Sequence, residues 1–421
     1  MRALLLLAFI PLADAGAQTP AAERALDLPE AYRLALARSE EIAISGATYE
    51  ETMARADEIF SHVLPQVSLM ATETFQDVPR GASGLFLQRQ REQGWVNLRQ
   101  PLFSGLREFL AFRAAKDAGR VAQLQLERAK QLLYRDVARA YLDLLAAQDD
   151  IRIRFSLLEI TRDRVKDLKE FRKVGRARAS EYLAAESQVA QQLAQLESAR
   201  AAEQVAQFKL GFLTGIEERM ALSTVPAPTA VPGLEGVLKR ARGRADVESR
   251  RADASAAELS IKVTTRQRWP AISLDANYYF QRPPSFTSDV KWDATITGAL
   301  PLYRGGEFKS QAAQAEARLR AKRAALSQAA RLAELEARSA HQELLSSISV
   351  TAALDNAERL AADNARAQAE DYRLGQVTNL DVLGSLNTLQ QTRLQQNSAR
   401  LNAYWSRVQL EVAAGAPGGS L

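Results

Sequence analysis

Apolar and polar positions divide the chain into long helical stretches and short alternating stretches. Between Leu106 and Lys173 there is no proline and a single glycine, Gly119, and apolar residues recur every seven positions in two rows. A period of seven is typical of helices that pack lengthwise against other helices. The stretch therefore predicts one helix on the order of 100 Å long, at about 1.5 Å per residue. The two rows are Leu126, Leu133, Ala140, Ala147, Leu168 and Val137, Leu144, Ile151, Leu158, Val165, interrupted at Lys130, Arg154 and Thr161.

Each long helix is followed by a glycine and a second helical stretch. Gly175 follows the first long helix, and a second helix is expected over 179–213. The later half has the same arrangement, with a helix over 307–374, a break at Gly375 and a helix over 380–413. Glycine is favoured just beyond a helix C-terminus because the backbone there adopts a left-handed conformation. The pattern predicts two long helical hairpins, closed by glycines with positive φ.

Before each long helix the period of the pattern changes to two. Apolar and polar residues alternate over about ten positions, which predicts strands with one apolar and one polar face. Strands of this length are long enough to cross a bilayer when tilted. The alternative is a pair of soluble hairpins that cap the helices. The expected strands are 66–76, 94–103, 272–281 and 292–300, with connections at 79–93 and 282–289.

Matching segments occur 200 residues apart in the two halves of the chain. Pro101-Leu102-Phe103-Ser104-Gly105 returns as Pro301-Leu302-Tyr303-Arg304-Gly305. A duplication this long differs from a solenoid of short repeats and predicts one structural unit used twice. Such pseudo-symmetry suits rings, tubes and pores better than a catalytic pocket. The expected divisions are a first unit at 18–225, a proline-rich linker at 226–232, a second unit at 233–415 and a disordered tail at 416–421, and the units open with helical segments at 28–63 and 234–268.

The first residues have the pattern of a secretory signal peptide. A basic start is followed by an apolar run over 3–12 and by Ala15-Gly16-Ala17, which predicts a signal peptide over 1–17. The alternative, an uncleaved anchor, is disfavoured because ten apolar residues are too few to span a bilayer of about 30 Å. The chain is therefore expected to be exported.

Composition excludes several classes of function. Aromatic residues make up 7% of the chain, which suits packed helices. The net charge of +5 offers no support for nucleic-acid binding. The absence of cysteine excludes disulfides and thiolate chemistry. His62 and His341 have no ligand pattern around them, and no catalytic or phosphate-binding motif occurs. The sequence therefore indicates neither an enzyme nor a cofactor.

Membrane insertion would need a closed barrel made by several copies. After the signal no run of about 18 apolar residues occurs, which leaves a barrel as the way to cross a bilayer. Four strands cannot close a barrel, since the smallest bacterial barrels have about eight. Three copies would pool about twelve strands and two copies about eight. The alternative function is a soluble periplasmic coiled-coil adaptor or scaffold.

The order of these segments resembles the TolC-type outer-membrane efflux proteins. The resemblance implies a mostly α-helical chain with a β-barrel portion: long coiled-coil hairpins and four transmembrane strands per chain. It further implies a homotrimer with a twelve-stranded barrel in the lipid of the outer membrane, an α-helical tunnel in the periplasm, and docking to a periplasmic adaptor and an inner-membrane pump. The segments that carry the resemblance are Leu26 to Ala31, Leu64-Pro65 with the strand after it, Gln100 to Gly105, its copy at Leu300 to Gly305, and Tyr372 to Leu383.

The resemblance also assigns roles to residues at the turns of the hairpins. Four turn residues are similar to the adaptor-contacting tips of the family: Val174, Gly175, Leu374 and Gly375. Glu181 and Asp381 lie six positions after the turn glycines and resemble pore-facing carboxylates. The alternative for both is a favourable charge near a helix N-terminus, which is worth about 0.3–1 kcal/mol.

The chain departs from the family pattern near the second turn. Tyr372 matches an aromatic residue that helps to hold the entrance closed, but its usual basic partner is replaced by Val377. A second acidic ring is missing, because its position is Gly384. Arg176 and Arg178 end a basic stretch and are expected to frame the entrance or to pair with Glu181, with a solvated helix face as the alternative.

Overall fold

The computed structural model describes residues 25–77, 89–283 and 285–416. The expected signal peptide at 1–17 lies outside the described residues. Of the tail expected at 416–421, only Ala416 is described, and its N–H donates to the carbonyl of Glu411 (2.9 Å).

The elements follow the same order in both halves of the chain. The long helices α3 and α7 have 67 residues each. Among the described residues no helix is both long and apolar enough to cross a membrane. The first half contains α1 (Leu28–Arg38), α2 (Glu40–Ser61), β1 (Gln66–Phe75), β2 (Gln90–Phe103), α3 (Arg107–Lys173) and α4 (Ala179–Thr214). The second half contains α5 (Leu234–Arg242), α6 (Ala245–Thr265), the 3₁₀ helix η1 (Arg266–Arg268), β3 (Ala271–Gln281), β4 (Trp292–Ala299), α7 (Glu307–Arg373) and α8 (Asn379–Ala413).

The prediction of one helical segment at the start of each half was wrong, because each half begins with two helices separated by a break. Ser39 has an extended backbone and caps α2, where its hydroxyl accepts from the N–H of Ile42 (3.4 Å). In the second half the break falls at Gly243 and Arg244. The Arg244 side chain is almost fully buried and is paired with Asp246 (2.7 Å) and Glu336, so these ion pairs fix the chain where α6 begins.

One strand begins earlier than the alternation indicated. Residues 90–93 were expected in a connection, but they belong to β2. They pair with β1 over Thr72 to Phe75, opposite Gln93 to Gln90. All four side chains are polar, so these residues show no apolar alternation. Their backbone pairing with β1 identifies them as part of the strand.

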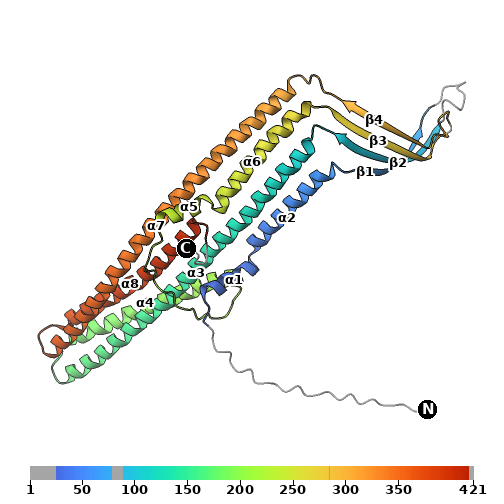
Figure 1. Cartoon of the computed structure of the whole chain (residues 1–421). Coiled ribbons are helices and arrows are strands. Elements are labelled where there is room, and N and C mark those ends of the chain that lie inside the picture. Colours follow the sequence, from blue (N-terminus) through green and yellow to red (C-terminus); the bar gives the residue numbers. More distant parts are fainter. Residues whose placement is uncertain (1–24, 78–88, 284, 417–421) are drawn as a thin grey trace, which may run out of the picture.

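Helices and strands form one open layer that is four elements wide (Figure 1). The sheet has the order β1-β2-β3-β4 and lies at one end. Next to the sheet the helices follow the order α2-α3-α6-α7. Toward the hairpin tips the contacts between helices give the order α4-α3-α8-α7. The layer therefore has two different edges. We call β1, α2 and α4 the first edge, and β4 and α7 the second edge.

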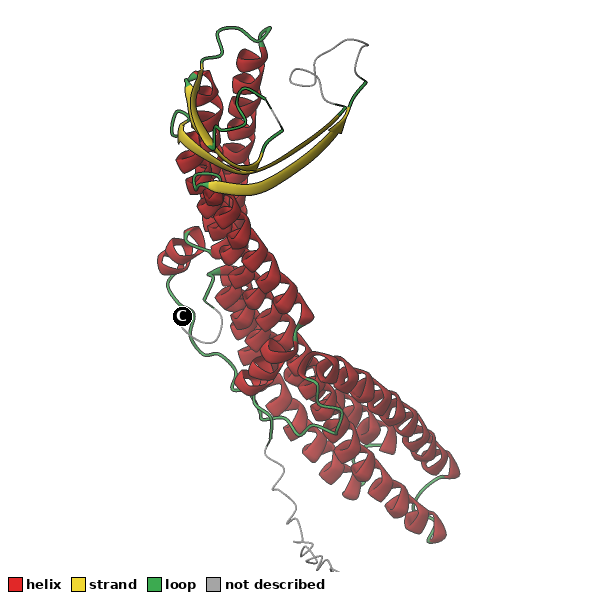
Figure 2. Cartoon of the chain, turned by 90° about the vertical axis from the view of Figure 1, so that its right-hand side faces the viewer, coloured by secondary structure: helices red, strands yellow, loops and turns green. Residues whose placement is uncertain are grey.

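The sheet has one apolar and one polar face, as the alternation predicted. Val67, Leu98, Ala276 and Ala294 follow one another across the four strands in register. On the other face Asn97 donates to Asn277 (2.9 Å) and Asn277 donates to Asp293 (2.8 Å). Arg99 pairs with Asp275 (2.8 Å) on this polar face. Figure 2 shows that the strands curve as they leave the helices.

The main apolar core lies midway along the helices. It is built from α1, α3 and the ends of α4 and α8 away from the tips. Tyr141 is fully buried there, and its hydroxyl lies 2.9 Å from the carbonyl oxygen of Leu26 and 2.7 Å from that of Ser223. Leu26 also forms a parallel bridge with Leu222. These contacts hold the segments before α1 and after α4 against one face of the layer.

Candidate functional site at the hairpin tips

The two hairpins end in turns of the same geometry. Gly175 has φ 76° and Gly375 has φ 75°, so the predicted positive φ is confirmed. In the first turn the N–H of Arg176 donates to the carbonyl of Phe171 (2.8 Å), and in the second the N–H of Gln376 donates to that of Asp371 (2.9 Å). This six-to-one hydrogen bond is typical of a glycine that ends a helix.

A hollow of about 750 Å³ separates the two turns. Tyr372 and Val377 contribute to its wall from the second hairpin. Two of the residues predicted for the tips, Val174 and Asp381, do not line it. The structure therefore brings most of the predicted residues to one place. Those that line the hollow are Gly175, Arg176, Arg178, Glu181, Tyr372, Leu374 and Gly375.

Both predicted carboxylates cap their own helices. Glu181 accepts from the N–H of Arg178 (3.4 Å) at the start of α4. Asp381 accepts from the N–H (2.9 Å) and the hydroxyl (2.6 Å) of Thr378 at the start of α8. The two hydrogen bonds from Thr378 hold the pKa of Asp381 below its usual value. Capping is therefore a structural role of both residues, and it leaves the exposed Asp381 charged.

An arginine that the sequence did not single out connects the two hairpins. Arg164 of α3 places its guanidinium over the ring of Tyr372, 3.7 Å from the ring centre. Its Nε donates to Oδ1 of Asn379 (3.0 Å), and the Asn379 amide donates to the carbonyl of Glu181 (3.4 Å). Asn379 is 1% exposed. This network joins α3, α4, α7 and α8 beside the hollow.

Burial changes the titration of the network without changing its charges near neutral pH. Burial raises the pKa of Tyr372, and the charge of Glu181 acts in the same direction, while Arg164 opposes both. Burial lowers the pKa of Arg164, whereas Tyr372 and nearby carboxylates favour its charged form. Because tyrosine and arginine have unperturbed pKa values of about 10 and above 12, the phenol is neutral and the guanidinium is charged at neutral pH.

The two predicted arginines at the first turn do not pair with Glu181. Arg176 lies over the ring of Phe171 at 5.7 Å, and Arg178 contacts Glu181 through its backbone. Within the part of the chain that the structure describes, neither guanidinium forms an ion pair with Glu181. Of the two expectations for these arginines, pairing with Glu181 was wrong and framing the entrance remains a prediction.

The sequence matches a family of known membrane proteins over nearly its whole length. The match to the Outer membrane efflux protein family covers residues 31–216 and 239–416. The chain belongs to the Outer membrane efflux protein family. Members of this family are efflux channels of the outer membrane that extend into the periplasm, so the protein is a channel and not an enzyme. The alternative of a soluble periplasmic adaptor or scaffold is therefore excluded.

Several known outer-membrane proteins are similar to this chain in sequence or in fold. Outer membrane protein TolC of Escherichia coli is 23% identical over 410 residues, which cover 93% of this chain and 83% of TolC. VceC of Vibrio cholerae has a TM-score of 0.81 at 19% identity, over 93% of this chain and 96% of VceC. The open state of MtrE from Neisseria gonorrhoeae has a TM-score of 0.79 at 18% identity, over 92% of this chain and 89% of MtrE.

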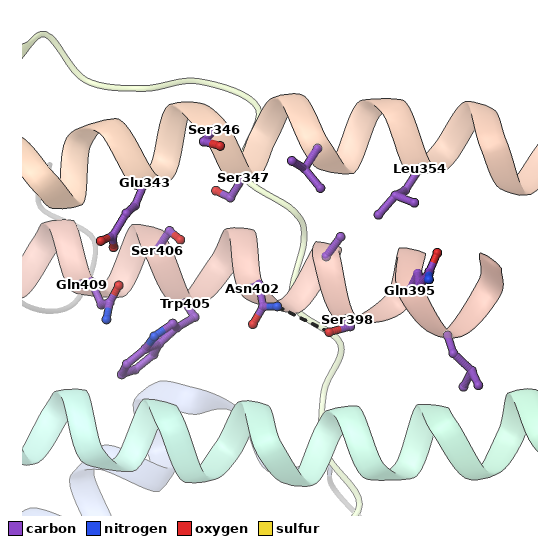
Figure 3. A pocket seen from close by; sticks show the side chains of 13 residues that line it. Glu343, Ser346, Ser347, Leu354, Gln395, Ser398, Asn402, Trp405, Ser406 and Gln409 are labelled. Carbon is purple, nitrogen blue, oxygen red and sulfur yellow. Dashed lines mark hydrogen bonds between the residues drawn. The ribbon is translucent and has the colours of Figure 1, made fainter. Parts of the chain in front are cut away.

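A second hollow, of about 760 Å³, lies between α7 and α8 of this efflux protein (Figure 3). Seven of the thirteen described residues that line it are serine, asparagine or glutamine, and five of the others are apolar, among them Leu354 and Trp405. With its amide oriented to satisfy both neighbours, Gln409 accepts from Nε1 of Trp405 (3.1 Å) and donates to Glu343 (3.1 Å). The segment that joins α4 to α5 passes behind these helices. The hollow therefore opens on the face of the layer opposite that segment.

Sequence reasoning missed Arg164 and Asn379 as members of the site of this efflux protein. A charged residue in a basic stretch is normally assigned to the solvated face of a helix. The available signal was position, since Arg164 lies one helical turn before Leu168, which is fully buried. Asn379 directly follows the capping residue of α8 and offered no comparable signal.

Proposed function

We propose that three copies of the chain form an exit channel for a tripartite efflux or secretion system. The copies pool their strands into a twelve-stranded barrel and their helices into a periplasmic tunnel, which receives substrates from a periplasmic adaptor and an inner-membrane pump. The observation that carries the proposal is the open layer with two different edges. Within the described residues, β1 and β4 each have a strand partner on one side only.

Closure by further copies follows from the behaviour of strand edges in lipid. An open sheet edge in a bilayer leaves backbone groups without hydrogen bonds, so a spanning sheet must close. Because the first and second edges differ, each copy would join the next head to tail, and such contacts close as a ring. Four strands are too few for a barrel, whereas three copies reach twelve. The apolar face of the sheet supplies the surface that lipid requires.

The matching halves suit this ring. The proposed units at 18–225 and 233–415, joined by the linker at 226–232, each contribute two strands and one long hairpin. Each copy then provides two similar segments of the wall, so three copies form a tube from six such segments. The equal lengths of α3 and α7 support a wall of uniform height.

One face of the layer is suited to line the bore. Residues between α4 and α5 cross the other face, where they would obstruct a narrow tube if they lay inside it. We therefore assign the bore to the face that carries the hollow between α7 and α8 (Figure 3). Glu343 is the one charged residue among the described residues that line this hollow, so the lining would let solutes of either charge pass. The narrow end of the bore would then lie at the hairpin tips.

Mass determination in detergent combined with planar-bilayer recording tests the proposal. We expect the purified protein to have the mass of three chains and to form ion-conducting pores. A monodisperse monomer would exclude a barrel shared among copies. A trimer that forms no pores would exclude a channel.

The exposed tips are suited to contact an adaptor. Val174 and Leu374 are each about two-thirds exposed at the ends of the hairpins. Large apolar side chains at such positions favour a protein partner. We propose that these residues, with Gly175 and Gly375, dock to the periplasmic adaptor, and that Glu181, Asp381, Tyr372, Arg176 and Arg178 surround the entrance.

Gly375→Val is expected to weaken adaptor docking and transport more than it weakens assembly. A side chain at Gly375 would meet nothing within 4 Å, so the cost comes from its positive φ alone. For a residue with a Cβ this is about 1–2 kcal/mol, and valine, being branched, tolerates it poorly. Transport and adaptor pull-down should both fall while the mass of the assembly is unchanged.

Gly375→Asn is the matched control, because asparagine tolerates the left-handed conformation. It should keep most of the transport that Gly375→Val loses. Normal transport by Gly375→Val, with the protein fully inserted, would show that the turn geometry does not matter for docking.

A further inference from the structure

We propose that Arg164 is the basic partner of Tyr372 in this protein and holds the two hairpin tips of one copy together. Position 377, where the family resemblance led us to expect that partner, holds a valine. The inference rests on the proposed function, because it concerns how the entrance of the channel is kept closed.

The geometry gives Arg164 contacts on three helices. From α3 its guanidinium covers the Tyr372 ring of α7 at 3.7 Å, and its Nε donates to Asn379 of α8 (3.0 Å). A guanidinium over an aromatic face is attracted by the ring and gains strength where water is excluded. A planar group can stack on the ring and donate in its own plane at the same time, which a lysine cannot do.

Burial shows that these contacts are more than a surface pair. The Nη2 atom of Arg164 is buried and has no hydrogen-bond partner among the described residues. Losing water from a guanidinium nitrogen is costly, so Arg164 is held here by the contacts that its other atoms make. Without Tyr372 and Asn379 in place, the side chain would regain water by turning outward.

Valine at position 377 cannot perform this role. Val377 packs against an apolar cluster that includes Leu157, Val382 and Leu386, and it offers neither charge nor donor. The cation is instead supplied from the first hairpin to the second, within one copy. The tips of one copy are then linked before any neighbour is present.

Few other polar contacts join the hairpins near the tips. In the described part of α4 and α8, Gln188 donates to Asn387 (2.8 Å), and Asn379 donates to the carbonyl of Glu181 (3.4 Å). Asn379 is positioned by Arg164, so removing the guanidinium weakens both ends of the network. The α7–α8 hairpin would then move more easily away from the α3–α4 hairpin.

Planar-bilayer recording of Arg164→Met tests this inference. Methionine keeps the aliphatic packing and removes the charge and the donors. We expect the ratio of open to closed time to rise about tenfold, which corresponds to about 1.4 kcal/mol. Lys166→Met is the matched control, since Lys166 is exposed and pairs within its own helix with Asp163 (2.8 Å). Its open-to-closed ratio should equal that of the unchanged protein.

Substitutions of Tyr372 test the same contact by changing the ring instead of the guanidinium. They also keep the inference testable if Arg164→Met does not assemble. Tyr372→Leu should open the channel to a similar extent, and Tyr372→Phe, which keeps the ring, should stay closed. The double variant Arg164→Met, Tyr372→Leu should open no further than Arg164→Met alone, because Arg164→Met already removes the contact between the guanidinium and the ring.

The possible results separate this inference from the proposed function. Unchanged gating in Arg164→Met and Tyr372→Leu, with intact trimers that conduct, would overturn the role of Arg164 alone. Failure of the unchanged protein to form trimers or pores would instead overturn the proposed channel.

Discussion

Replacing Phe208 and Phe212 with glutamate is expected to leave the chain monomeric. Both side chains lie on α4 at the first edge of the layer and are 73% and 76% exposed. In the proposed ring this edge meets α7 of the next copy, where Leu332 and Leu335 are about half exposed. Burying one phenylalanine contributes about 1.5–3 kcal/mol, and each ring contains the contact three times. A buried unpaired carboxylate would reverse that gain.

The mass of the protein in detergent measures this effect, and Phe155→Glu provides its control. Phe155 is about half exposed on α3, which lies inside the layer rather than at an edge. The control should therefore stay trimeric. A trimer formed by the double variant of Phe208 and Phe212 would show that α4 does not form the contact between copies.

Cross-linking gives a second measurement of the same contact. Phe212 lies 37 residues after Gly175, and Leu335 lies 40 residues before Gly375, so the two are at similar heights above the tips. The chain contains no cysteine, so Phe212→Cys with Leu335→Cys introduces a single reactive pair. Oxidation should link neighbouring copies covalently, and either cysteine alone should not.

Neutralising Glu181 and Asp381 is expected to abolish a preference for cations. Three copies of Asp381, with Glu181 nearby, would place like charges around one axis at the narrow end of the tunnel. Such a ring attracts cations, and salt screens it over about 10 Å at 0.1 M. The double variant Glu181→Gln, Asp381→Asn should shift the reversal potential in a salt gradient toward zero, most strongly at low salt.

These amide replacements separate charge from helix capping. Asparagine and glutamine keep the shape of the side chain and an oxygen that can accept from Thr378 or Arg178, so the helices should still start at the same residues. Unaltered selectivity and block by multivalent cations, in an intact trimer, would place both carboxylates outside the pore.

The pH dependence of selectivity provides a further check on Asp381. Hydrogen bonds from Thr378 hold its pKa below the usual value, so it stays charged at a pH where an ordinary aspartate takes up a proton. Cation preference should therefore persist as the pH falls to about 3.9, the unperturbed value, and be lost only below it. Loss of preference near pH 6 would point to other groups.

Regular patterns made much of the fold predictable from the sequence. The absence of proline and the seven-residue rows located α3, and glycines at matching places located both turns, because such features act locally. The break at Arg244 could not be predicted, since it depends on Glu336, which is distant in the chain. The position of β2 likewise depends on pairing with β1.

The candidate site was predictable only where its residues act locally. Gly175 and Gly375 follow from helix termination, and the capping role of Asp381 follows from the preference for acidic residues near a helix N-terminus. Arg164 escaped notice because its role depends on Tyr372 and Asn379, which reach it only after the hairpins pack. A sequence pattern shows which residues can be buried, but the packing of the hairpins determines that the Arg164 guanidinium lies over the Tyr372 side chain.

Because the two edges of the layer differ, damage to one of them has a genetic consequence. A copy altered at α4 keeps an intact α7 edge and can still join a normal neighbour, yet the ring that it enters cannot close. In a cell that makes equal amounts of both kinds of copy, about one in eight of the three-copy rings would contain only normal copies. Alleles that damage one edge should therefore be dominant, whereas alleles that prevent folding should be recessive.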